Sequence, residues 1–153
     1  MKHELIVLAH NIRSTYNVGS FFRTADGAGV TKLVLSGYTG VPPHKGIAKV
    51  ALGAEEWFPW EYVKSPATWL KKMKKAGYQI AVLEQTSKAK NLFSWKPKFP
   101  LILIVGNEVR GVSPALQKYA DTHLEILMRG KKESLNVATA MGVAVYSLLW
   151  NSR

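Results

Sequence analysis

The sequence predicts an α/β domain with a mostly parallel β-sheet that helices cover on both faces. Short apolar runs alternate with helical patterns along the 153 residues, as in successive βαβ units. Runs such as residues 4–10 and 101–105 are apolar almost throughout, which is typical of strands buried on both faces. The length fits one domain, so we expect residues 1–153 to form a single domain with nothing appended.

Each expected element follows from a local pattern. Six apolar runs are the predicted strands, at residues 4–10, 32–36, 57–63, 79–83, 101–105 and 122–127. The predicted helices occupy residues 17–28, 47–53, 66–76 and 134–150, with a further short helix beginning at Ser113 and Pro114. The Gly-, Pro- and Lys-rich stretch 37–46 and the polar stretch 86–99 are expected to be loops.

Two of these helices have start signals. Ser65 and Ser113 are each followed by a proline, which suits an N-cap and a first helical residue, and Gly77 is expected to end the first of the two helices. That helix also carries four lysines mostly off its apolar stripe: Lys71, Lys72, Lys74 and Lys75. They either form a solvated face or contact a polyanion.

The net charge is the first functional clue. Lysine and arginine total 21 against 10 acidic residues, a balance of +11, which favours a polyanionic partner such as nucleic acid over a merely soluble basic protein. The chain has no cysteine, which excludes disulfide scaffolds, thiol catalysis and thiolate zinc sites. No apolar run approaches the about 20 residues that span a bilayer, and no signal peptide precedes the first strand, so we expect a cytoplasmic protein.

Searches for common catalytic motifs exclude several enzyme classes. No phosphate-binding P-loop and no serine nucleophile elbow is present. The stretch Gly27-Ala28-Gly29 lacks the third glycine of a dinucleotide fingerprint and follows a helix. The four histidines lack metal-ligand spacing, so no metal site is expected.

Parallel sheets bind ligands beyond the carboxyl ends of their strands, and three polar clusters lie there. In the first cluster, residues 11–26, Asn17 either caps the following helix or serves a ligand. Arg23 lies in an otherwise small and apolar helix, so we expect it to be partly buried and to need an anionic acceptor, with Asp26 as one possible partner.

The second cluster is residues 101–111, where an apolar strand ends in Gly106, Asn107 and Glu108. Gly106 suits a site where a ligand lies against the backbone. Glu108 is either a solvated or helix-capping carboxylate or an acceptor that orients a ligand.

The third cluster is residues 126–141, where a basic loop precedes a helix. Ser134 or Asn136 could cap that helix, but the two polar side chains beside a basic loop also suit a nucleoside ligand.

Together and in this order, the clusters resemble the SpoU-type branch of the SPOUT superfamily of RNA methyltransferases. The matching stretches are NIRSTYNVGSFFRTADGAGV, LILIVGNEVRGVSPALQKYAD and LEILMRGKKESLNVATAMGVAVY, and KVALGAEEWFPWEY is similar to the family's middle region. The resemblance extends from about residue 5 to residue 149.

The resemblance implies an α/β fold with a C-terminal trefoil knot, a homodimer, and methyl transfer from S-adenosylmethionine to a ribose 2′-hydroxyl of RNA. The implied catalytic residues are Asn17, Arg23, Glu108, Ser134 and Asn136. The implied cofactor-binding residues are Leu83, Gly106, Ile126, Met128, Ser134 and Leu135. Arg23 would act on the ribose hydroxyl or stabilise its developing charge, Asn17 would position Arg23 or the ribose, and Glu108 would orient the active-site loop or the partner subunit's Arg13.

RNA contacts are expected from polar and basic side chains near the motifs: Asn11, Arg13, Arg110, Arg129, Lys131 and Lys132. We expect the chain to be almost only the family's catalytic domain, without an added RNA-binding domain, which favours tRNA over rRNA. The alternatives are an rRNA substrate, base methylation, or RNA binding without catalysis, and a partner protein that supplies RNA recognition stays open.

The apolar stripe of the final helix either forms a dimer surface or packs on its own sheet: Val137, Met141, Val145, Leu148 and Leu149.

Overall fold

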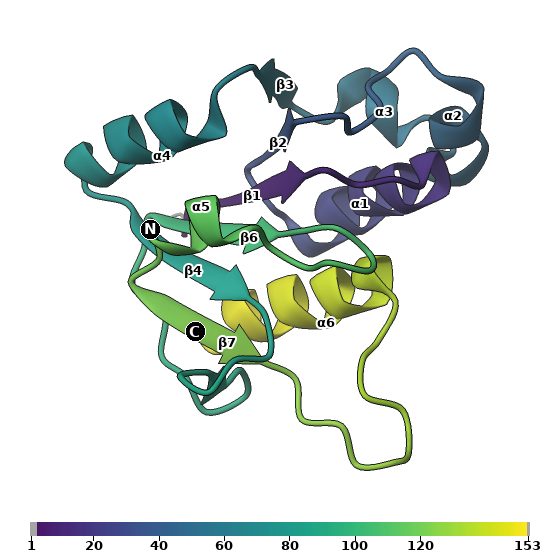
Figure 1. Ribbon diagram of the computed structural model, residues 1–153. Coiled ribbons are helices and arrows are strands. Elements are labelled where there is room, and N and C mark those ends of the chain that lie inside the picture. Colours follow the sequence, from purple (N-terminus) through teal and green to yellow (C-terminus); the bar gives the residue numbers. More distant parts are fainter. Residues whose placement is uncertain (1–2, 153) are drawn as a thin grey trace.

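The computed structural model describes residues 3–152 and contains a seven-stranded sheet with helices on both faces (Figure 1). The strands are β1 (Leu5–His10), β2 (Lys32–Ser36), β3 (Trp60–Val63), β4 (Gln79–Leu83), β5 (Lys90–Asn91), β6 (Leu101–Val105) and β7 (Thr122–Glu125). The helices are α1 (Thr15–Ala28), α2 (Lys45–Ala51), α3 (Ala54–Trp57), α4 (Pro66–Lys75), α5 (Pro114–Gln117) and α6 (Val137–Trp150).

The strand order is β3-β2-β1-β6-β4-β7-β5, and every neighbouring pair is parallel. This confirms the predicted parallel sheet. Because all strands run the same way, the loops that follow them emerge at one edge. The insertion of β6 between β1 and β4 brings the loop after β6 beside the loops that follow β1 and β4.

The central strands are buried on both faces, and successive side chains join different apolar clusters. On β1, Leu5 and Val7 belong to one apolar cluster, and Ile6 and Leu8 belong to the other. The first cluster includes residues of α1 and α6, which lie side by side against the sheet, and the second includes residues of α4 and α5 on the opposite face (Figure 1).

The sequence reasoning missed β5, a two-residue strand inside the predicted loop 86–99. Lys90 and Asn91 pair with the outer edge of β7, and the buried Leu92 donates its backbone N–H to the Glu125 carbonyl. The stretch is polar and too short for periodicity to reveal. The predicted strand 122–127 ends early, at Glu125, and the predicted helix 134–150 begins late, at Val137.

Two predicted caps are wrong in detail. Pro66 and Pro114 begin their helices as expected, but neither Ser65 nor Ser113 makes a side-chain cap. The Ser65 hydroxyl instead donates to Thr68 Oγ1 at 2.9 Å, and the proline after each serine removes an N–H near the cap.

The apolar stripe of α6 packs inside the domain. Met141, Val145 and Leu148 are fully buried, and Val137 and Leu149 pack against the same cluster. Met141, Val145 and Leu148 are therefore unavailable for a dimer surface, whereas Val137 and Leu149 stay partly exposed. Across residues 3–152, no helix combines the length and apolar character that crossing a bilayer would require.

Candidate functional site

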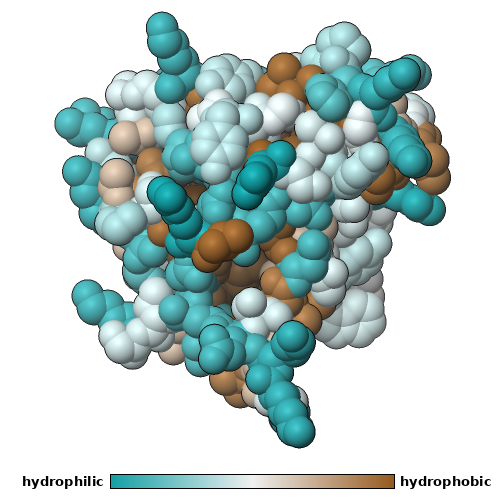
Figure 2. All heavy atoms as spheres, turned by 45° about the vertical axis from the view of Figure 1, so that its right-hand side comes forward, coloured by the Kyte–Doolittle hydropathy of each residue, from teal (hydrophilic) through white to brown (hydrophobic). Residues whose placement is uncertain are grey.

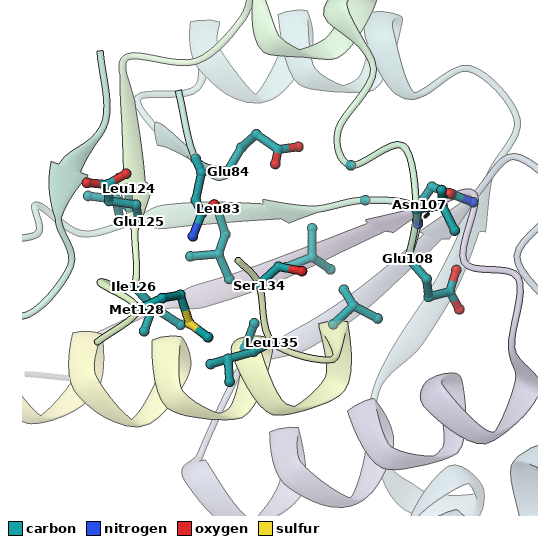
Figure 3. A pocket seen from close by; sticks show the side chains of 17 residues that line it. Leu83, Glu84, Asn107, Glu108, Leu124, Glu125, Ile126, Met128, Ser134 and Leu135 are labelled. Carbon is teal, nitrogen blue, oxygen red and sulfur yellow. Dashed lines mark hydrogen bonds between the residues drawn. The ribbon is translucent and has the colours of Figure 1, made fainter. Parts of the chain in front are cut away.

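A pocket lies at the carboxyl ends of β4, β6 and β7, where the loops after these strands meet the start of α6. All six residues predicted to bind a cofactor line it: Leu83, Gly106, Ile126, Met128, Ser134 and Leu135. Figure 3 shows Ile126 and Met128 at one end and Glu108 at the other. The space-filling view shows an apolar hollow framed by hydrophilic side chains (Figure 2).

The charge of this pocket opposes that of the whole protein. Its floor is apolar, with Leu83, Leu124 and Leu135 among its residues. Three carboxylate side chains line it, Glu84, Glu108 and Glu125, and no described lining residue is lysine or arginine. In a chain of net charge +11, this gives a site suited to a ligand with an apolar body and a positive charge.

The loop between Gly106 and Gly111 forms one wall and is held tightly. Asn107 and Gly111 exchange backbone hydrogen bonds of 3.0 and 2.9 Å. A Cβ at Gly106 would collide with the Gly111 carbonyl, so glycine is needed here for the loop to close rather than to admit a ligand. Glu84 braces the far end of the loop by accepting the Val112 N–H at 2.7 Å.

Glu108 joins this loop to the start of α1. Its carboxylate accepts the backbone N–H groups of Arg13 and Ser14, both at 2.8 Å, and the side-chain amide of Asn17 at 2.9 Å. Glu108 was predicted to orient the active-site loop or the partner subunit's Arg13. In the structure it binds the backbone N–H of Arg13 in its own subunit. The alternative of a merely solvated carboxylate is wrong.

The pKa of Glu108 reports the balance of these contacts. Partial burial alone would raise its pKa, but the hydrogen bonds from Arg13, Ser14 and Asn17 stabilise the charged form and outweigh burial. The net result is a pKa below the ordinary 4.5, so the carboxylate stays charged at neutral pH.

Asn17 and Asn136 extend the network to the third cluster. Ser14 caps α1, so the alternative that Asn17 caps this helix is wrong. Asn17 Oδ1 instead accepts a hydrogen bond of 3.3 Å from the side chain of Asn136, and Asn136 itself caps α6 by accepting from Ala138 and Thr139. Ser134 is exposed and lines the pocket.

A second pocket adjoins the first and shares the wall formed by residues 107–109. Its other described lining residues are Arg13, Tyr38 and Arg110. Both arginines were predicted to contact RNA, and both are exposed. The two pockets thus lie on either side of one loop.

The structure does not bring every predicted residue to these pockets. Arg23 is exposed rather than partly buried, lines neither pocket, and forms no ion pair among the described residues, while Asp26 accepts the indole N–H of Trp57. Arg23 lies six positions after Asn17, so the two side chains are roughly 120° apart around the helix axis. Arg23 therefore does not face the same side as Asn17.

The predicted RNA-binding residues also separate into groups. Asn11 has a positive φ of 56°, and its side-chain oxygen accepts the Tyr38 N–H at 3.1 Å, so it shapes the loop after β1. Three cations are exposed on the loop before α6 and line neither pocket: Arg129, Lys131 and Lys132.

Sequence reasoning missed several lining residues, among them Glu84, Asn107, Glu125 and Tyr38. Glu84 directly follows β4, Glu125 ends β7, and Asn107 and Tyr38 each come two residues after a strand, β6 and β2. All four lie at or just beyond the carboxyl ends of strands, where parallel sheets bind ligands. Within residues 3–152, no group of three or more His, Asp or Glu side chains could hold a metal ion.

Comparisons with known proteins agree with this geometry. Residues 4–146 match the model of the SpoU rRNA Methylase family. The chain is 33% identical to a tRNA (guanosine(18)-2′-O)-methyltransferase of Aquifex aeolicus, over 94% of this chain and 67% of that one. It is 36% identical to the enzyme of the same name from Saccharomyces cerevisiae, over 95% of this chain but only 10% of that one.

The SpoU methyltransferase AviRb from Streptomyces viridochromogenes, solved with the cofactor AdoMet, superimposes with a TM-score of 0.86. It is 25% identical, and the match covers 98% of this chain and 61% of that one. The family match spans nearly the whole chain and includes every described residue that lines the two pockets. The chain therefore belongs to the SpoU rRNA Methylase family.

Proposed function

We propose that the protein methylates a ribose 2′-hydroxyl in RNA, with S-adenosylmethionine as methyl donor. The observation that carries the proposal is the network of Asn17, Glu108 and Asn136, which joins three distant segments at the wall of an acidic, partly apolar pocket. The names of the Aquifex aeolicus and yeast relatives support this reaction.

The first pocket fits the proposed donor. Leucine side chains suit a flat adenine, and Glu84, Glu108 and Glu125 suit a ligand that carries a sulfonium and an ammonium charge. We infer that Leu83, Gly106, Ile126, Met128, Ser134 and Leu135 hold this cofactor. When bound, the cofactor supplies a methyl group already activated by its sulfonium, so the proposal needs no metal.

The chain must also handle the proton of the ribose hydroxyl. That hydroxyl is a very weak acid, and attack requires it to lose its proton at least partly. Arginine is effectively always protonated, so we infer that Arg23 binds the RNA phosphate and stabilises the developing alkoxide, and acts as a base only if that phosphate perturbs it strongly. Asn17, Glu108, Ser134 and Asn136 would fix the loops that align donor and acceptor.

Because Arg23 is exposed and away from both pockets, this role requires a second molecule. We infer that the protein acts as a homodimer in which α1 of one subunit presents Arg23 to the site of the other. Replacement of Arg23 by alanine should abolish turnover and leave cofactor affinity unchanged. Near-wild-type activity of that variant would remove Arg23 from the mechanism.

Further parts of the proposal follow from the family. We infer that the segment from β6 to α6 is threaded as a trefoil knot, and that the protein is cytoplasmic.

We favour tRNA as the substrate because the two relatives reported above are named for it, with rRNA as the alternative that the family description favours. Arg13, Arg110, Arg129, Lys131 and Lys132 are the expected phosphate contacts, with a partner protein as a further possible source of recognition.

The deciding experiment is transfer of labelled methyl groups from S-adenosylmethionine to total tRNA and to total rRNA, followed by nucleoside analysis. Label in a 2′-O-methyl nucleoside supports the proposal, and the labelled pool identifies the substrate class. Label on a base would overturn the chemistry. Cofactor binding without any label would favour a binding protein of the same fold.

A further inference from the structure

We propose that the ring of Tyr38 is a stacking platform for a nucleobase of the substrate RNA, with Arg13 and Arg110 binding the phosphates beside it. This inference rests on the proposed function and adds a recognition residue that the motifs do not include. Tyr38 lies in the Gly- and Pro-rich loop after β2, and it lines the second pocket.

The ring is exposed and yet fixed at both ends. Tyr38 is 61% exposed, although an aromatic side chain of this size stabilises a protein most when it is buried. Its hydroxyl accepts a hydrogen bond of 2.7 Å from the Asn107 side chain, and its backbone N–H donates to Asn11 Oδ1 at 3.1 Å. The ring is therefore already ordered, so stacking of a ligand on it would cost little additional side-chain entropy.

The loop beneath the ring is also braced. The adjacent Thr39 is buried, and its hydroxyl accepts the Ile12 N–H at 3.0 Å. The Tyr62 hydroxyl donates to the Gly37 carbonyl at 2.8 Å. These contacts hold the platform from the loop after β1 and from β3, which is typical of a preorganised binding surface rather than a mobile loop.

The charges around the ring fit a nucleotide. Arg13 and Arg110 line the same pocket, and their backbone N–H groups are anchored by Glu108 Oε1 and by Asn107 Oδ1. Glu108 also lines this pocket, but hydrogen bonds from Arg13, Ser14 and Asn17 occupy both of its oxygens. Proteins commonly bind single-stranded nucleic acid where an aromatic ring shares a pocket with cationic side chains: the cations hold phosphates and the ring stacks a base of any identity.

The position of the pocket specifies which part of the RNA would stack. Asn107, Glu108 and Val109 belong to the walls of both pockets, so only this loop separates the Tyr38 pocket from the acidic pocket. A base held against Tyr38 would therefore belong to the target nucleotide or to one close to it along the strand.

The test measures equilibrium binding of total tRNA, without turnover, to Tyr38→Leu and Tyr38→Phe. Loss of a stacked base costs about 10-fold in affinity, so Tyr38→Leu should bind total tRNA about 10-fold more weakly. Tyr38→Phe keeps the ring and should bind within about 3-fold of wild type. The Kd for S-adenosylmethionine should be unchanged in both variants, which shows that the shared loop is intact.

Two controls separate stacking from charge and from general loss of an exposed ring. Polyphosphate has the charge of RNA without bases, so its affinity should be unchanged in Tyr38→Leu. Phe93→Leu removes another exposed aromatic ring at the opposite edge of the sheet, in a residue that lines neither pocket, and should bind tRNA like wild type.

Three results would overturn the inference. Wild-type affinity in Tyr38→Leu would show that no base stacks there. Equal losses in Tyr38→Leu and Tyr38→Phe would assign the effect to the hydroxyl and its bond to Asn107. A wild-type protein that binds neither tRNA nor rRNA would overturn this inference and the proposed function together, whereas methyl transfer with an unaffected Tyr38→Leu variant would overturn the stacking alone.

Discussion

The two pockets have opposite charge although they share the loop of residues 107–109. The first is lined by Glu84, Glu108 and Glu125, and the second is flanked by Arg13 and Arg110. Charged residues from the loops after several strands therefore place a site for a cation next to a site for an anion. The positive net charge of the chain predicts only the site for an anion, because the acidic pocket is a local exception to that charge.

Glu108 is the one carboxylate that belongs to both pockets, and its removal should have the largest effect. In Glu108→Ala, two backbone N–H groups and the Asn17 amide lose their acceptor, and each unsatisfied group costs about 1–3 kcal/mol. We expect kcat/KM for RNA methylation to fall by about 100-fold or more. Glu56→Ala, on exposed α3, is the control. Activity within a few fold of wild type would show that the two pockets do not depend on this carboxylate.

Leu135 should affect the first pocket alone. Truncation to alanine removes part of its apolar lining, and a buried leucine side chain contributes about 1.5–3 kcal/mol, so the Kd for S-adenosylmethionine should rise by about 10-fold. RNA affinity should not change. Leu127→Ala, an exposed leucine on the same loop that does not line the pocket, provides the matched control for calorimetry. Equal effects of the two variants would argue against this location of the cofactor.

Arg13 and Arg110 should affect the second pocket alone. Each alanine variant should weaken RNA binding several-fold and reduce the slope of log affinity against log salt by about 1, because one phosphate contact is lost. Cofactor affinity should stay constant, since neither side chain lines the first pocket. A salt slope unchanged in both variants would contradict phosphate binding at this site.

Acidification should affect the shared loop only at low pH. Because the pKa of Glu108 is below 4.5 in the folded protein, its contribution to stability is fully present above the ordinary value and is lost as pH falls through the lower, folded value. An NMR titration of the Glu108 carboxyl group should give a midpoint below 4.5. A midpoint above this value would mean that burial outweighs the hydrogen bonds from Arg13, Ser14 and Asn17.

The smallest effect is expected from α4, on the opposite side of the sheet from α1 and α6. Lys74 forms an ion pair of 3.0 Å with Asp121, and Lys71 and Lys72 are exposed. The double variant Lys71→Gln and Lys72→Gln should change RNA affinity by less than about 2-fold, measured at the salt concentration used for the arginine variants. A loss as large as that of Arg110→Ala would extend the RNA surface to this helix.

Local patterns predict the parallel sheet, and the family resemblance supplies the predicted residues of the first pocket, which the strand ends position. Leu83, Gly106 and Ile126 each follow or end an apolar run, and parallel strands end at one edge. The strand order, which places β6 between β1 and β4, has no local pattern, and neither has the pairing of Glu108 with the start of α1. Arg23 illustrates the same limit: its apolar neighbours suggest burial, but its position around α1 makes it exposed.

The bonds of Glu108 and Asn136 also have a consequence for synthesis of the chain. Arg13 and Glu108 are 95 residues apart, and Asn17 and Asn136 are 119 residues apart. A growing chain therefore cannot assemble this network until residue 136 has left the ribosome. A chain released before residue 108 would leave the N–H groups of Arg13 and Ser14 without their carboxylate acceptor, and one released before residue 136 would lack the bond to Asn17.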